Sequence, residues 1–143
     1  MKKLLGIIGM VFLLFACGTT GKQHSAKQNL ANEERDTLSY EQRRKYNYFF
    51  LEAVRLKQKG EYDAAFELYK HCLDIYPGSA PALYEISQFY MVLGQEQKGE
   101  EALKKAVRSD ESNFWYKQTL AVYYQRKRDW AKAIAVYDDM AHQ

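Results

Sequence analysis

A period of 34 residues runs through the chain from Tyr46 to Gln143 and constrains the fold more than any other feature of the sequence. Small residues recur at this spacing in two sets: Ala53, Ser87 and Ala121, then Ala65, Gly99 and Ala133. Large residues recur between them in the same register: Leu56, Tyr90 and Tyr124, then Tyr69, Leu103 and Tyr137. A repeat of this length predicts a stack of similar units, each contacting its neighbours.

Each unit is predicted to contain two helices. The first small residue of a unit precedes its large residue by three positions and the second by four, as Ala65 precedes Tyr69, and both spacings place the pair on one helical face. Gly60 and Gly94 fall between the two helices, where a left-handed residue ends a helix at little cost. Pro77 closes the second helix of the first unit.

The clearest stretch is Gly60-Glu61-Tyr62-Asp63-Ala64-Ala65-Phe66-Glu67-Leu68-Tyr69, followed by Pro77. This pattern closely resembles the tetratricopeptide repeat (TPR) family over residues 46–143. The resemblance implies an all-α fold, a right-handed superhelix of antiparallel helix pairs, with three repeats at about 46–79, 80–113 and 114–143, the last incomplete. It also implies a concave groove, lined by the first helix of each pair, that binds peptides or helices of other proteins.

Several residues depart from the repeat pattern. Lys117 and Glu52 stand at positions that are apolar in the other units, Glu111 stands where the first unit has proline, and Arg128 stands where the other units have glycine. Three of these four departures, Glu52, Lys117 and Arg128, lie in the outer units, as is common for terminal repeats. Cys72 shares its register with Ala106 and Met140, so we expect a buried residue between helices.

Residues 1–16 read as a secretory signal peptide. Met1-Lys2-Lys3 is positively charged, and Leu4–Phe15 is an apolar run of 12 residues, shorter than the roughly 20 needed to span a bilayer. Leu14-Phe15-Ala16-Cys17 resembles a bacterial lipobox, which implies cleavage before Cys17 and attachment of diacylglycerol to its sulfur. The alternative is a plain signal peptide in which Cys17 has no special role.

Residues 17–38 follow as an acylated cysteine and a flexible polar tether, with Leu30 almost its only large apolar residue. Gly18, in place of aspartate after the cysteine, implies the outer membrane under the enterobacterial sorting rule. We therefore expect a lipid-anchored protein of the bacterial cell envelope. The helical repeat domain is predicted at 39–143, because Ser39 and Gln42 have the spacing of a capping box that starts a helix near Tyr40.

Composition argues against several function classes. The 21 basic and 18 acidic residues nearly balance, and Lys2 and Lys3 belong to the signal region, so no nucleic-acid footprint remains. With Cys17 acylated, Cys72 is the single thiol and cannot form an internal disulfide. No metal-ligand spacing, phosphate-binding loop or catalytic motif is found, so we expect neither an enzyme nor a cofactor.

The family resemblance also assigns positions in the groove. One known subclass binds a C-terminal carboxylate through two lysines, two asparagines and an arginine, but the matching positions here are Phe50, Val54, Glu85, Trp115 and Thr119. An apolar or amphipathic partner segment is therefore expected, with Tyr84 and Trp115 exposed and with Phe50 and Val54 either in the groove or packed within the stack. The predicted groove residues are Asn47, Phe50, Val54, Tyr84, Gln88, Met91, Trp115, Gln118 and Val122.

Two functions remain open from the sequence. The first is a membrane-tethered, non-catalytic scaffold that recruits another envelope protein, and the second is the docking or sensing part of a longer protein. We also expect an exposed apolar face on the last helix pair, and self-association or fraying at that end. The residues of this predicted face are Tyr123, Ile134, Tyr137 and Met140.

Overall fold

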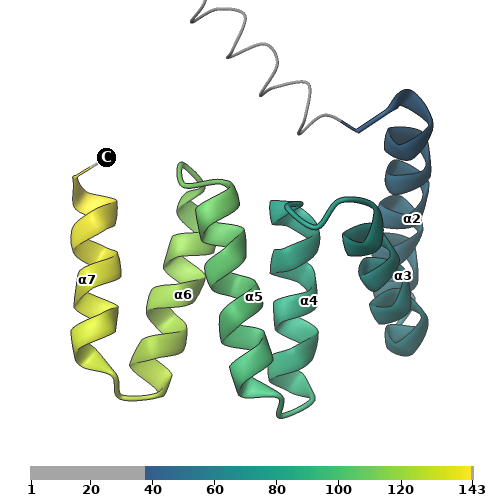
Figure 1. Cartoon of the computed structure of the whole chain (residues 1–143). Helices are drawn as coiled ribbons and strands as arrows, with labels where there is room; N and C mark the ends of the chain where they lie inside the picture. The colour runs from purple at the N-terminus through teal and green to yellow at the C-terminus, as the bar shows by residue number, and fades with distance from the viewer. Residues whose placement is uncertain (1–37, 143) are drawn as a thin grey trace, which may run out of the picture. The chain divides into compact units, whose positions relative to one another are not determined.

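The computed structural model describes residues 38–142, and within this range it contains six α-helices and no strand (Figure 1). The predicted signal peptide, Cys17 and the tether lie outside the described residues. No helix in the described range is long and apolar enough to cross a membrane. The helices are α2 (Tyr40–Gln58), α3 (Tyr62–Ile75), α4 (Ala80–Val92), α5 (Glu96–Ser109), α6 (Phe114–Arg126) and α7 (Trp130–Ala141).

The helices pack in chain order, each against the next, and the closest pairs are α2 with α3, α4 with α5, and α6 with α7 (Figure 1). These are the three helix pairs that the 34-residue period predicts. Successive pairs meet where α3 contacts α4 and where α5 contacts α6. The described residues thus form an all-α stack of helix pairs, as expected for a helical repeat.

The turn within each pair is built in the same way three times. Its central residue has a positive φ, which is +82° at Gly60, +71° at Gly94 and +59° at Arg128. The next residue donates its N–H to a carbonyl five residues earlier, at 3.0, 2.8 and 2.9 Å respectively. This bond is typical of a left-handed helix end, so the predicted roles of both glycines and of Arg128 are confirmed.

The first helix of each pair starts at a side-chain cap. Ser39 and Gln42 form the predicted capping box: the Ser39 N–H donates to Gln42 Oε1 at 3.0 Å, and the Gln42 N–H donates to Ser39 Oγ at 3.2 Å. Ser79 accepts from the N–H of Ala82, and Asn113 accepts from two N–H groups of α6. The long first helix beginning at Tyr40 is therefore confirmed.

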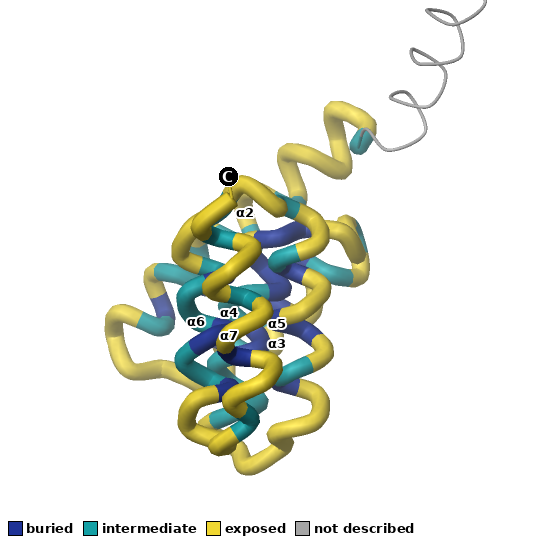
Figure 2. Tube along the Cα trace, turned by 90° about the vertical axis from the view of Figure 1, so that its left-hand side faces the viewer, coloured by how far each residue is buried: buried dark blue, intermediate teal, exposed yellow. Residues whose placement is uncertain are grey.

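Small residues of the predicted register are buried between helices, and Figure 2 shows the buried positions gathered inside the stack. Ala65 is 0% and Ala133 is 2% exposed. A Cβ added to Gly99 would lie 2.8 Å from Met91 Cγ and 3.2 Å from the Ser87 carbonyl oxygen, so α4 and α5 approach too closely there for a larger residue. Cys72 is also fully buried, and burial raises the pKa of its thiol to about 11, which fits an unreactive residue between helices.

The departures from the repeat pattern are compensated locally. Lys117 is buried, and its ammonium group forms an ion pair with Asp139 across the α6–α7 pair. Glu52 forms an ion pair with Arg55 one turn later on α2. Each charged residue that replaces an apolar residue of the repeat is thus paired with an opposite charge in its own helix pair. The packing of the helices is therefore preserved.

Candidate protein-interaction groove

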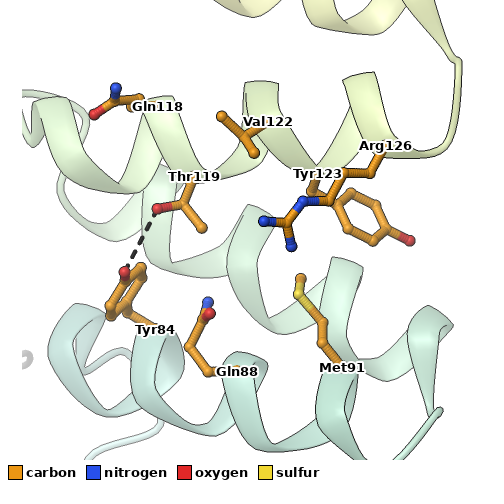
Figure 3. Close-up of a pocket in the computed structure, with 8 residues that line it drawn as sticks. All are labelled: Tyr84, Gln88, Met91, Gln118, Thr119, Val122, Tyr123 and Arg126. Carbon is orange, nitrogen blue, oxygen red and sulfur yellow. Dashed lines mark hydrogen bonds between the residues drawn. The ribbon is translucent and has the colours of Figure 1, made fainter.

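A hollow of about 250 Å³ lies between α4 and α6, the first helices of the second and third units (Figure 3). The close-up shows side chains from both helices reaching toward the same space. We call this hollow the α4–α6 groove. It is lined by Tyr84, Gln88 and Met91 from α4 and by Gln118, Thr119, Val122, Tyr123 and Arg126 from α6.

Helical spacing explains why these side chains share one surface. Tyr84, Gln88 and Met91 follow one another at intervals of four and three residues, which places them on one face of α4. Gln118 and Val122 have the same relation on α6. Five of the nine residues predicted for a binding groove therefore come together here.

Tyr84 anchors one end of the α4–α6 groove. Its ring stacks on Tyr116 with centroids 4.9 Å apart, and its hydroxyl lies 3.5 Å from Thr119 Oγ1 (Figure 3). Thr119 in turn donates to the Trp115 carbonyl at 2.8 Å. Because these contacts leave Tyr84 half-buried, the expectation that it would be an exposed residue is wrong.

The four other predicted groove residues lie outside this hollow. Asn47 is exposed on α2, whereas Phe50 and Val54 pack half-buried against the core of the first unit. Phe50 lies between Tyr46 and Tyr69, with ring centroids 5.8 and 5.6 Å away. For Phe50 and Val54 the structure thus favours packing within the stack.

Trp115 is exposed, as predicted, but does not line the groove. Its side chain is 69% exposed at the start of α6, and its ring meets that of Phe114 edge-on at 5.5 Å. An exposed tryptophan beside the groove is available to a partner that extends past Tyr84.

The prediction that Tyr123 belongs to an exposed face at the last helix pair is wrong. Tyr123 lines the α4–α6 groove, and its hydroxyl donates to Glu100 Oε2 of α5 at 3.4 Å. Burial raises the pKa of this tyrosine above its usual value. The reason is register: Tyr123 lies 34 residues after Phe89, which packs back onto Phe66 and Tyr69 of α3, so both side chains point toward the preceding unit.

Three lining residues, Thr119, Tyr123 and Arg126, are not among the nine predicted groove residues. Thr119 and Tyr123 each lie one residue after a predicted member, Gln118 or Val122, so α6 contributes a strip two residues wide. Matching positions 34 residues apart reveals a single line of side chains on each helix. The width of the strip depends on the angle between α4 and α6, which the period does not encode.

The lining of the α4–α6 groove is mixed in polarity. It combines two amides, two tyrosines, a threonine, the apolar Met91 and Val122, and one charged group, Arg126. No carboxylate is among these lining residues. The nearby Glu100 of α5 accepts hydrogen bonds from the hydroxyls of Tyr123 and Tyr124. Within residues 38–142 no cluster of His, Cys, Asp or Glu could hold a metal ion.

Comparison with known families agrees with the fold. A family model described as tetratricopeptide repeat matches residues 56–123, from the end of α2 to the groove side of α6. A search of curated proteins found no match. The match supports the resemblance, and the chain has an all-α, tetratricopeptide-like helical repeat fold. Repeats of this kind generally mediate protein–protein interaction.

Proposed function

We propose that this protein is a non-catalytic scaffold of the bacterial cell envelope, which binds a segment of another envelope protein in the α4–α6 groove. The observation that supports it is the lining of the groove, where amide and hydroxyl groups stand beside Met91 and Val122. Apolar side chains of a partner can be buried against Met91 and Val122, and the partner's backbone can form hydrogen bonds with the amide and hydroxyl groups. Arg126 adds a preference for an acidic group near one end.

Attachment to the membrane belongs to the same proposal. It depends on Leu14-Phe15-Ala16-Cys17 behind the apolar run, a pattern typical of lipidation at the cysteine. Multiple acyl chains would hold the protein stably, since each buried methylene contributes about 0.8 kcal/mol. Cys17→Ser should abolish incorporation of labelled fatty acid. Unchanged labelling together with unchanged membrane fractionation would remove this part of the proposal.

Site-specific photo-crosslinking in cells tests the binding site. A photoreactive residue at Gln118, in the groove, should give a discrete adduct with one partner. The control is the same residue at Lys104, which is exposed on α5 and absent from the groove lining. No adduct from position 118, or equal adducts from both positions, would contradict binding in the groove.

A second candidate function is that these helices dock or sense on behalf of a longer protein. The observation that favours it is the exposed apolar surface of α7, where Ile134 is 58% exposed. A following helix in the same protein would bury such a surface. An immunoblot of the producing cells decides between the two, because a species well above the 16.8 kDa of this chain favours the longer protein.

A further inference from the structure

A second hollow, more apolar than the groove, lies at the edge of the stack where the turns within the first two helix pairs are found. Its volume is about 420 Å³, within the range of ligand-binding sites. Phe66 of α3 and Phe89 of α4 form its floor, with ring centroids 5.6 Å apart. We call it the turn-edge hollow.

The rim of the turn-edge hollow is apolar and unusually exposed. Val92 and Leu93, at the end of α4, are 87% and 56% exposed, and Tyr62, at the start of α3, is 59% exposed. Exposed apolar residues are ordinary when scattered singly. Three that surround a hollow with an aromatic floor form a continuous patch, which marks an interaction site.

The repeat provides an internal control for Val92 and Leu93. At the same two positions the first unit has Gln58 and Lys59, and the third unit has Arg126 and Lys127, all of them exposed. A polar residue therefore serves the fold equally well at both positions. The repeat therefore does not require apolar residues at positions 92 and 93, and contact with a partner would account for them.

Polar groups at the mouth of the hollow indicate what kind of molecule fits. Asp63 and Lys57 are among the lining residues, and the Lys57 ammonium group donates to Glu85 Oε2 at 2.5 Å. Gln88 supplies an amide. An apolar hollow with a rim of charge and amide suits a polypeptide, which presents apolar side chains and backbone hydrogen-bonding groups together. An acyl chain would leave these polar groups unused.

The turn-edge hollow also adjoins the α4–α6 groove. Gln88 of α4 lines both spaces, so the two lie on either side of this residue and share its side chain. A partner segment that lies in the groove and crosses α4 at Gln88 can contact both spaces.

We infer that the turn-edge hollow receives one bulky aliphatic or aromatic side chain of a partner polypeptide, as a second contact for the segment held in the α4–α6 groove. This inference rests on the proposed scaffold function. The side chain packs on Phe66 and Phe89 and is covered by Val92 and Leu93, in the manner of an anchor residue at a protein interface. The segment's backbone bonds to Gln88.

The test is a selection of random 12-residue peptides on the immobilised full chain, followed by affinity measurements with the selected peptides. The variant V92Q/L93K carries the residues that the first unit has at these positions, so its fold should be kept, which circular dichroism checks. Selected peptides should share a bulky apolar residue and bind this variant at least tenfold more weakly. Tyr48→Gln, which removes an exposed aromatic side chain on α2, should change affinity less than twofold.

Two further arms separate the outcomes. If V92Q/L93K binds the peptides as the parent does while Val122→Gln in the groove binds them weakly, the anchor role is overturned and groove binding stands. If no peptide is selected, both the inference and the proposed function are contradicted. If lauric acid binds the parent but not V92Q/L93K and no peptide depends on these residues, the hollow is a lipid site and the inference is wrong.

Discussion

The two outermost described helices, α2 and α7, differ in the residues at positions that would contact a neighbouring unit. On α2 these positions hold Glu52 and Arg55, which form an ion pair. The same positions in later units hold Ile86 and Leu120, then Phe89 and Tyr123, all of them against the preceding unit or in the core. Tyr48 is an exposed aromatic residue on α2. However, Glu52 and Arg55, and not Tyr48, occupy the positions at which the other units contact their neighbours.

On α7 the corresponding residues are apolar. Tyr69 of α3 and Leu103 of α5 are 0% exposed beneath the helices that follow them, whereas Tyr137 in the same register is 37% exposed. Ile134, one turn earlier, is 58% exposed. Fully burying one such side chain is worth about 1.5–3 kcal/mol, so this surface favours a neighbour over water.

The comparison shows that one period produces two kinds of outer surface. Charged residues at the contact positions of α2 make that helix a suitable end for the stack, since a second unit placed there would have to desolvate an ion pair. On α7 the contact positions keep the residues of an internal interface. We therefore expect any stacking partner, whether a second copy or another polypeptide, to bind at α7 and not at α2.

The largest predicted difference in stability concerns Leu103 and Tyr137. They occupy the same position of the repeat, Leu103 inside the stack and Tyr137 at its edge. Leu103→Ala should lower the free energy of unfolding by about 2–5 kcal/mol, because it leaves a cavity in a closed interface. Tyr137→Ala should cost well under half of that in the monomer. Urea unfolding at low protein concentration measures both, and equal losses would mean that α7 is as well covered as α5.

The next largest effect compares the helix crossings at the two ends. Ala65→Leu and Ala133→Leu should each overpack a buried site and cost about 1–3 kcal/mol. Ala131→Leu, at an exposed position of α7, is the control and should be nearly neutral. Thermal unfolding is the measurement. A parent-like midpoint for Ala65→Leu would show that the register is wrong, and a small loss for Ala133→Leu alone would show that α7 frays.

The smallest effect concerns the turns. Arg128→Gly should stabilise by about 1 kcal/mol or be neutral, because a side chain in the left-handed region is strained and glycine is not. Gly60→Arg, the reverse exchange in the first unit, should destabilise by a similar amount. If both exchanges are destabilising, Arg128 contributes a contact that the turn geometry does not account for.

The sequence predicts the parts of this fold that depend on local spacing. The small residues at the helix crossings, the turns at Gly60 and Gly94 and the capping box at Ser39 each depend on a few neighbouring positions and on the period. The structure confirms them for that reason. The strained turn at Arg128 follows from the same comparison of units.

The parts that depend on angles between helices were predicted less well. The sequence does not show how α4 and α6 are oriented relative to each other. Tyr84 was therefore expected to be exposed, and Tyr123 was expected to lie at the end of the stack. The burial of Lys117 depends on its reach to Asp139 on another helix. The turn-edge hollow could have been suspected from Val92 and Leu93, because the matching positions in the other two units hold polar residues.

Sedimentation velocity of residues 39–143 over a range of concentrations, with hydrogen exchange of α7, tests the central comparison most directly. We expect association that grows with concentration and protects α7, together with loss of that association in Ile134→Gln/Tyr137→Gln but not in Tyr48→Gln. A strict monomer at high concentration with a fully protected α7 would contradict the account, because the outer face of α7 would then be stable in water without a partner.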